Sequence, residues 1–268
     1  MGARITTGVL LSLALAACAR PVGPSGNWRT VDLYGVGVHL QYPELLRPNA
    51  ARVNSAIQRW IGDSCTKSPM VRDTYLRHDK YRDARACVSA LSRVCAAQEG
   101  GYSYSPTSCQ ATITVTVKMH TAGFLVLALE SYGLRLSGLM GTPHPGWDYE
   151  FLNLDTRTGH VLSLGELVNL NPPHPTDLER EIVGSLRAQF HIPANRTLKQ
   201  AGFDTEYPPI AKRVEVTPDG LIFVYKKYEL KFPVGTRPRI MVPYSALSAL
   251  IPATSPLRRL LPASGVVH

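Results

Sequence analysis

The stretch ATITVTVKMHTAGFLVLALESYGL, residues 111–134, decides the fold of this chain. The apolar residues of its first part recur at every second position: Ile113, Val115, Val117 and Met119. This period of two is typical of a strand with one buried face. After a short break at residues 121–123, the run FLVLALESYGL is apolar at most positions. The pair predicts an antiparallel hairpin whose second strand is buried on both faces.

Upstream of this hairpin, two helices and a strand are predicted. The run YGVGVHLQYP, residues 34–43, alternates like a half-buried strand. A helix of about three turns is predicted after it, with Asn49 as its N-cap and Gly62 as its stop. Residues 79–97 form the second predicted helix, which carries two cysteines.

Downstream, strands and helices alternate again. The run YEFLNLD predicts a strand that closes in the turn DTRTG. Two helices are predicted from their capping boxes, Ser163 with Glu166 and Thr176 with Glu179. A hairpin around residues 218–220 and a last strand and helix complete the pattern. Strands in short hairpins with helices between them predict an α+β fold, with antiparallel sheets and helices packed on one face.

The chain begins with a short apolar segment that ends in a cysteine. Residues 9–17 are apolar except for Ser12, and this run is about half of the ~20 residues that a spanning helix needs. It predicts a signal peptide over residues 1–17. The residues Leu15-Ala16-Ala17-Cys18 resemble a bacterial lipobox, in which the cysteine thiol receives diacylglycerol. We therefore expect a membrane anchor on Cys18, with the protein facing the periplasm or the cell exterior.

The expected organisation follows from these boundaries. A tether rich in proline, glycine and serine spans residues 18–27, and Ala19 slightly favours the outer membrane where the cell has one. A smaller N-terminal region with a disulfide-stapled helix spans residues 28–125, and a second domain spans residues 126–251. Residues 252–268 are expected to form a poorly ordered tail.

Four further cysteines, an even number in an exported chain, indicate two disulfides: Cys65, Cys87, Cys95 and Cys109. A continuous helix would hold Cys87 and Cys95 about 12 Å apart, beyond the ~7 Å limit for a bridge. Two pairings remain. Cys65 pairs with Cys87 and Cys95 with Cys109, or Cys65 pairs with Cys95 and Cys87 with Cys109, and sequence proximity favours the first. Because the spacing contains no CxxC pair and no HxxxH, no metal site is predicted.

The chain is basic, with 29 Lys and Arg residues against 20 Asp and Glu residues and a formal net charge of +9. Removal of Arg4 with the leader leaves +8. Much of the excess positive charge lies in residues 67–93, which contain seven basic residues and three aspartates. Such a surface outside the inner membrane suits anionic lipid headgroups or an acidic wall polymer, or serves only as a solvated face. Nucleic acid is not an expected partner there.

Residues 141–159, GTPHPGWDYEFLNLDTRTG, contain the candidate functional side chains. His144 lies between two prolines, and Trp147, Asp148 and Tyr149 follow it. A histidine beside acids can serve as a base or a ligand, but between two prolines it also suits a structural turn. We therefore predict a binding loop that includes His144, Trp147, Asp148 and Tyr149.

Catalytic motifs are incomplete in this sequence. It contains no GxSxG, no HExxH and no glycine-rich phosphate loop. The SxxK pattern at residues 64–67 lacks its companion motifs, and its second residue is expected in a disulfide. A carboxylate pair of Asp155 and Glu229 is less favoured than an acid that caps a turn and a separate acid at a strand end. We therefore expect no catalytic activity and no cofactor, with a cell-wall hydrolase using His144 as a less favoured alternative.

Residues 131–251 resemble a known family in the order of their motifs. These motifs are the glycine and His-Pro stretch at residues 141–145, the strand FLNLD with Thr158-Gly159, Leu162-Ser163-Leu164, Asp219-Gly220-Leu221, Tyr228-Glu229, Gly235, Val242-Pro243-Tyr244 and Leu247. The sequence is similar to the extracytoplasmic C-terminal domain of the anti-sigma factor RsiV. That domain type also occurs in the cell-wall deacetylase PdaC and in a secreted mycobacterial immunogen. Here Pro143 is inserted before the family histidine, His144.

The resemblance implies a binding or scaffold domain, because the RsiV domain binds lysozyme. We expect no cytoplasmic sigma-binding segment, transmembrane helix or deacetylase unit in this chain. The favoured hypothesis is a lipid-anchored, non-catalytic binding module for a cell-wall polymer or an envelope protein. The alternative is a lysozyme-binding or lysozyme-inhibiting lipoprotein, for which Asp148 and Glu150 would have to offset the basic net charge.

Overall fold

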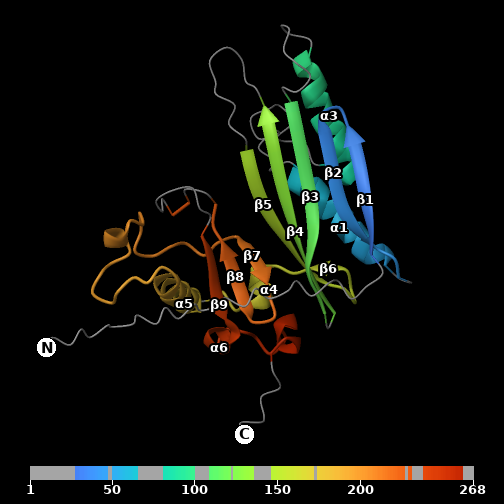
Figure 1. The fold of residues 1–268 in the computed structure, drawn as a ribbon. Helices are drawn as coiled ribbons and strands as arrows, with labels where there is room; N and C mark the ends of the chain where they lie inside the picture. Colours follow the sequence, from blue (N-terminus) through green and yellow to red (C-terminus); the bar gives the residue numbers. More distant parts are fainter. Residues whose placement is uncertain are drawn as a thin grey trace, which may run out of the picture.

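The computed structural model describes residues 28–47, 50–65, 81–99, 109–121, 123–135, 146–171, 174–226, 229–230 and 238–261. These residues form an α+β fold with two sheets (Figure 1). The strands of the larger sheet are β1 (Trp28–Gly35), β2 (Val38–Leu45), β3 (Cys109–Thr121), β4 (Phe124–Arg135), β5 (Gly146–Asp155) and β6 (His160–Val161), in that order. The predicted fold class is confirmed.

One strand pair of the larger sheet departs from the predicted antiparallel arrangement. β2 and β3 run parallel, with Leu40 opposite Ile113, while the other neighbours are antiparallel. Parallel neighbours need a long crossover connection. Here the connection contains α1 (Ala51–Cys65) and α3 (Ala84–Glu99), so the sheet is mixed.

The predicted strand over residues 34–43 is wrong at its start. Tyr34 belongs to β1, and the chain turns at Val36 and Gly37 before β2 begins. Gly37 has a φ of 64°, a conformation that residues with a Cβ rarely adopt. Val36 is therefore half exposed in a turn, whereas Val38, Leu40 and Tyr42 are buried in the core as the alternation predicted.

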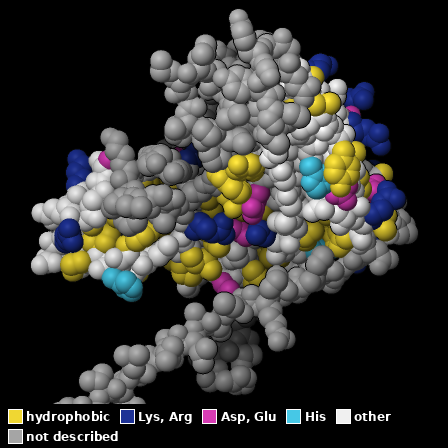
Figure 2. All heavy atoms as spheres, turned by 45° about the horizontal axis from the view of Figure 1, so that its top comes forward, with side chains coloured by type: hydrophobic (Ala, Val, Ile, Leu, Met, Phe, Trp, Pro, Cys, Tyr) yellow, Lys and Arg dark blue, Asp and Glu magenta, His cyan; other side chains and the backbone are white. Residues whose placement is uncertain are grey.

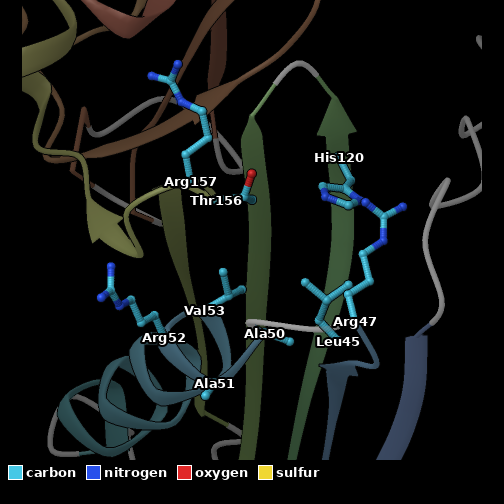
Figure 3. Close-up of a pocket in the computed structure, with 9 residues that line it drawn as sticks. All are labelled: Leu45, Arg47, Ala50, Ala51, Arg52, Val53, His120, Thr156 and Arg157. Atoms are coloured by element: carbon cyan, nitrogen blue, oxygen red, sulfur yellow. The ribbon is translucent and has the colours of Figure 1, made fainter.

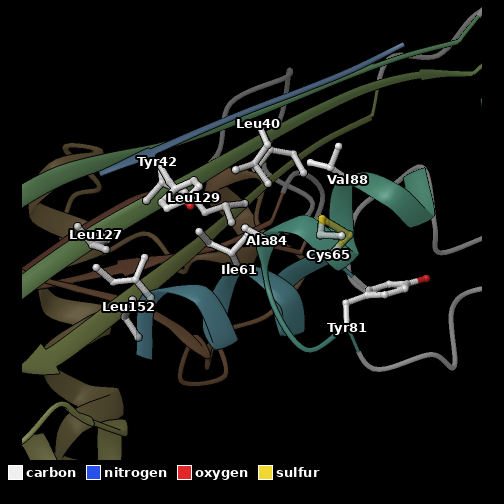
Figure 4. Packing of buried hydrophobic residues seen from close by; sticks show 14 of the residues in the cluster. Leu40, Tyr42, Ile61, Cys65, Tyr81, Ala84, Val88, Leu127, Leu129 and Leu152 are labelled. Carbon is white, nitrogen blue, oxygen red and sulfur yellow. A yellow bond between two sulfur atoms is a disulfide. The ribbon is translucent and has the colours of Figure 1, made fainter. Parts of the chain in front are cut away.

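Both helices pack against one face of the larger sheet (Figure 1). Val53, Ile57 and Ile61 of α1 are buried among leucines of the strands, and Figure 4 shows Ile61 and Val88 facing the sheet. The predicted stop at Gly62 is wrong, because α1 continues to Cys65. At Gly62 an added Cβ would lie 2.1 Å from the carbonyl oxygen of Tyr81. Gly62 therefore permits a close contact between α1 and the segment before α3.

The two disulfides staple α3 to the segments on either side of it. Cys65 is bonded to Cys87, and Cys95 is bonded to Cys109. All four cysteines are buried. The pairing favoured by sequence proximity is confirmed.

The predicted hairpin of β3 and β4 is confirmed, with one change of face. The register shifts between Val117 and Met119, which makes Lys118 an extra residue in β3. Ile113 and Val115 therefore pack under the helices, whereas Met119 packs in a second core with Phe124 and Val126. The boundary expected after residue 125 falls inside β4, which contributes side chains to both cores.

The second core lies under a three-stranded antiparallel sheet of β7 (Arg213–Val216), β8 (Gly220–Val224) and β9 (Arg239–Pro243). The remaining elements are α4 (Leu164–Leu167), α5 (His174–Gln189), η3 (Lys199–Ala201), α6 (Tyr244–Leu247) and η4 (Pro256–Arg259). The capping box of Ser163 and Glu166 is confirmed at α4. The one proposed at Thr176 is wrong, because α5 already begins at His174.

Asn153 joins the two sheets. Its side-chain amide donates a hydrogen bond to the carbonyl of Val214 (2.8 Å), and its side-chain oxygen accepts one from the N–H of Val216 (3.3 Å). Asn153 is buried, so each of these backbone groups is satisfied in a place that water does not reach. The smaller sheet is thereby fixed beside β5.

The chain remains ordered beyond the predicted start of the tail at residue 252. Leu257 of η4 is fully buried, and the buried hydroxyl of Ser255 donates to the carbonyl of Leu167 (2.8 Å). These contacts correct the prediction for residues 252–261, while residues 262–268 lie outside the described part. No helix within the described ranges is long and apolar enough to cross a membrane.

Candidate binding face

The larger sheet carries a continuous row of side chains on the face opposite α1 and α3. The strand registers place Tyr34 beside His39, His39 beside Thr112, Thr112 beside Tyr132, and Tyr132 beside Trp147. Residues directly opposite each other in a sheet point to the same face. We call this line, Tyr34, His39, Thr112, Tyr132 and Trp147, the aromatic row.

Ring contacts organise both ends of the aromatic row. The rings of Tyr34 and His39 stack with centroids 4.6 Å apart and planes 4° apart. At the other end, the rings of Tyr132 and Trp147 lie 4.7 Å apart and are tilted. Tyr34 is 74% exposed and Trp147 is 52% exposed. Large rings that stay exposed in one line mark a surface suited to binding.

A second line of side chains runs beside the aromatic row. The same registers align Asp32, Gln41, Thr114, Glu130 and Tyr149, which we call the polar row. Nε2 of His39 lies 2.9 Å from Oδ1 of Asp32, and the side-chain amide of Gln41 donates to the same oxygen (3.1 Å). The hydrogen bond from His39 lowers the pKa of the Asp32 carboxyl. This network ties the two rows together at the β1 edge.

Figure 2 shows this organisation of the surface. To the right of the centre, a histidine lies beside hydrophobic and acidic side chains. A mostly white band separates them from a central group in which acidic and basic side chains lie side by side. White marks the backbone as well as side chains that are neither charged nor hydrophobic.

A shallow cavity of about 200 Å³ continues the binding face towards the smaller sheet. Its lining residues are Lys118, Ala128, Glu130, Tyr149, Phe151, Val224 and Arg239. The guanidinium of Arg239 lies 6.0 Å from the ring centroid of Phe151 and forms an ion pair with Glu215. The cavity therefore combines an aromatic floor with side chains of both charges, an arrangement that can hold a polar ligand with an apolar face.

The predicted binding loop is only partly described, and its described part is a strand. Trp147, Asp148 and Tyr149 lie in β5. His144 and Cys18 lie outside the described residues. Trp147 and Tyr149 point to the binding face, whereas Asp148 alternates with them and pairs with Ser131 of β4.

Asp148 and Glu150 form ion pairs at the junction of the two sheets. Arg213 of β7 lies 3.5 Å from the carboxylate of Asp148 and 3.1 Å from that of Glu150, and its Nε donates to the carbonyl of Tyr149 (2.6 Å). Lys226 lies 3.9 Å from Asp148. The side chains of Asp148 and Glu150 are only 13% and 14% exposed. These acids hold the sheets together and are not presented to a partner.

Two solved structures have a similar fold. A DUF3298 family protein from Bacteroides fragilis aligns with a TM-score of 0.60 and 13% identity, over 88% of this chain and 98% of its own. A DUF3298 family protein from Pseudomonas aeruginosa PAO1 aligns with a TM-score of 0.61 and 14% identity, over 89% and 97%. This chain has the fold of those DUF3298 proteins. The likeness extends well beyond residues 131–251, on which the resemblance in sequence rests. No family model matches the chain, and no curated protein matches it.

The other polar candidates have structural partners. Asp155 accepts a hydrogen bond from the N–H of Arg157 (2.9 Å), so it caps the turn as expected, and it pairs with Arg259 (3.1 Å). Glu229 accepts from the N–H of Lys226 (2.6 Å). In the described part of the chain, no three His, Cys, Asp or Glu side chains gather in a way that could hold a metal ion.

The sequence reasoning missed Tyr34, His39 and Tyr132 as members of the face. Each of them alternates with core-facing residues along its strand, so the period of two does place it on the face away from the core. Only the register across five strands brings them into one line with Trp147. That register depends on the parallel pairing of β2 and β3, which the sequence did not reveal.

Proposed function

We propose that this chain is a non-catalytic binding module of the bacterial envelope, and that its binding face holds a glycan strand of the cell wall. The observation that carries the proposal is the aromatic row, which lines up two ring pairs across five strands, each with one exposed ring. Its fold, shared with the DUF3298 structures, and its resemblance to the RsiV domain are compatible with a binding role.

The chemistry of a glycan complements the two rows. The C–H-rich face of a sugar ring stacks on an aromatic ring, and its hydroxyls need hydrogen-bonding partners at the edge. Tyr34 and Trp147 supply exposed ring faces, while Gln41, Thr114 and Glu130 supply donors and acceptors beside them. The row extends over four strand spacings of about 4.8 Å, or roughly 19 Å. It therefore suits an extended ligand with several rings.

The expected location supports a ligand in the cell wall. The two disulfides are typical of an oxidising compartment outside the inner membrane. The lipobox-like sequence that ends at Cys18 favours an anchor that keeps the domain next to the wall. Lipidation of Cys18 belongs to this proposal.

Binding to lysozyme is not favoured. The acids on which it would depend, Asp148 and Glu150, are paired with Arg213 and mostly buried. Animal-type lysozymes are strongly basic, as is this chain, so long-range repulsion would oppose association. For the hydrolase alternative, His144 lies outside the described residues.

Co-sedimentation of the purified full chain with insoluble peptidoglycan tests the proposal. We expect saturable binding of the wild type, and a loss of affinity of about tenfold or more in Trp147→Ala, as for an aromatic anchor at an interface. Tyr207→Ala is the matched control, because Tyr207 is 77% exposed but lies outside both rows. No binding by the wild type, or an equal loss in Tyr207→Ala, would contradict the proposal. Release of soluble peptidoglycan fragments by the wild type would contradict the proposal that the module is non-catalytic.

A further inference from the structure

A second, larger cavity lies at the opposite end of β3 from the aromatic row. It has a volume of about 470 Å³ and is bounded by the end of β2, the first turn of α1, the end of β3 and the turn after β5. Its lining residues are Leu45, Arg47, Ala50, Ala51, Arg52, Val53, His120, Thr156 and Arg157. Figure 3 shows Arg52 and Arg157 on one side and Arg47 beside His120 on the other, with the start of α1 between them.

The charge of this cavity is one-sided. Its lining includes three arginines and one histidine but no acid. Asp155, next to the lining, lies 3.2 Å from Arg157 and 3.1 Å from Arg259, so a single carboxylate is shared by two guanidiniums. Arg52 makes no ion pair with another described residue. Positively charged groups that line one cavity repel each other, and a bound anion would offset this repulsion.

The backbone around the cavity adds to its positive potential. α1 has 15 residues, and its first turn contributes Ala51, Arg52 and Val53 to the lining. The N-terminal end of a helix carries a partial positive charge that favours anions. Gly159, at a φ of 74°, lets the turn after β5 approach α1 closely, because a Cβ there would lie 3.0 Å from Cβ of Arg52. The elements that supply Arg52 and Arg157 are therefore packed against each other.

His120 completes the polar part of the lining. Burial, and then the nearby charge of Arg47, lower the pKa of His120. Its ring packs edge-on against Trp28, with centroids 5.4 Å apart. A ring N–H of an imidazole held in this way can donate a hydrogen bond to an oxygen of an anion.

We propose that this cavity binds a phosphate group, with Arg47, Arg52 and Arg157 around it and the first turn of α1 beneath it. Guanidinium groups match the oxygens of a phosphate in geometry as well as in charge. The cavity volume exceeds that of one phosphate, so the group can belong to a larger molecule. This site is separate from the glycan-binding face, and neither proposal depends on the other.

The position of the cavity suggests where the phosphate comes from. Trp28 begins β1 and contacts His120 at the cavity. Trp28 comes ten positions after Cys18, and a fully extended chain over ten positions spans at most about 36 Å. A lipid on Cys18 would therefore keep this end of the domain near the membrane, where phosphate occurs in lipid headgroups as well as in solution.

Two binding measurements on the full chain test the site and separate these sources. The first is a titration with inorganic phosphate at constant ionic strength, followed by calorimetry and by the NMR signals of the His120 ring. The second is co-sedimentation of the Cys18→Ser chain, which lacks the acceptor for the lipid, with vesicles of phosphatidylglycerol or of phosphatidylcholine. Arg52→Gln is the test variant. Arg59→Gln is its control, because Arg59 is also exposed on α1 but does not line the cavity.

Each outcome decides the proposal. Phosphate binding that shifts the His120 signals and weakens about tenfold in Arg52→Gln, but within about twofold in Arg59→Gln, supports a site for free phosphate. The same variant pattern on phosphatidylglycerol vesicles, with no binding to phosphatidylcholine, supports a headgroup site. The proposal is overturned if neither ligand binds, or if both variants lose affinity equally, since the effect would then reflect net charge alone.

Discussion

Tyr34 and Trp147 lie at opposite ends of one cross-strand row, separated by His39, Thr112 and Tyr132 on the same face of the sheet. At strand spacings of about 4.8 Å the two ends are roughly 19 Å apart. They cannot touch each other, but one extended ligand can contact both. The length of the ligand should therefore decide which residues matter.

Long and short glycan fragments should respond differently to changes in the row. For a long strand, Tyr34→Ala and Trp147→Ala should each weaken binding by about tenfold, and the double variant by about a hundredfold, because distant sites act nearly independently. A fragment of one or two sugars should be sensitive to one of the two changes only. Isothermal titration calorimetry of the three variants with fragments of graded length checks this. Equal effects at every length would contradict a single extended site.

Asn153 should contribute strongly to stability because it joins the two sheets. Asn153→Ala leaves the carbonyl of Val214 and the N–H of Val216 without their partner in a buried place. We expect a loss of about 3 kcal/mol in the free energy of unfolding, measured by urea denaturation. Asn171→Ala is the control, because Asn171 is exposed, and should change this free energy by less than about 0.5 kcal/mol. Similar losses in both variants would contradict the role of Asn153.

Two glycines in helices should respond to alanine with opposite signs. Gly62→Ala places a Cβ 2.1 Å from the carbonyl oxygen of Tyr81, so we expect a loss of about 1–3 kcal/mol in the free energy of unfolding. Gly184 of α5 has open space around it, so Gly184→Ala should add about 0.5–1 kcal/mol through helix propensity. Urea denaturation of both variants measures this difference. A gain in stability for Gly62→Ala would contradict the close contact.

Stability at acid pH should depend on Glu166. The N–H of Ser163 (2.8 Å), its hydroxyl (2.7 Å) and His160 (2.6 Å) bind the carboxylate and lower the pKa of Glu166 to about 2. Because the native pKa lies below the usual 4.5, this contribution is present above pH 4.5 and is lost as the pH falls towards 2. The side chain is 44% exposed, so solvent screening limits the contribution to about 1 kcal/mol or less.

The variant Glu166→Gln isolates that contribution. It should unfold at a lower temperature than the wild type at pH 6, and the two melting temperatures should converge near pH 2. Calorimetry across this range provides the measurement. Parallel curves over the whole range would show that the carboxylate does not stabilise the native state through its hydrogen bonds.

Much of the fold could be predicted from local patterns in the sequence. The alternation and the apolar run of residues 111–134 predicted the β3–β4 hairpin, and the spacing of Cys87 and Cys95 excluded their pairing. These features depend on neighbours in sequence or on the dimensions of one helix. The signals for β5, α1 and α3 were of the same kind.

The remaining features depend on contacts between distant segments. The turn at Gly37, the parallel pairing of β2 with β3, and the bulge that moves Met119 into the second core have no local signal of sufficient strength. Asp148 was predicted as a binding residue from its neighbours in the sequence. No sequence pattern shows that Arg213, far along the chain, lies 3.5 Å from it. Predicting the aromatic row would have required the pairing registers of all five strands, β1 to β5.

The most direct test of the binding face is the indole N–H signal of Trp147 in an NMR titration of the full chain with soluble peptidoglycan glycan strands. Trp60, on α1 and partly buried against the first core, is the internal control. We predict that the Trp147 signal shifts in a saturable manner while the Trp60 signal stays in place. A Trp147 signal that does not move at glycan concentrations where the strands bind, or a Trp60 signal that moves as far, would contradict the account.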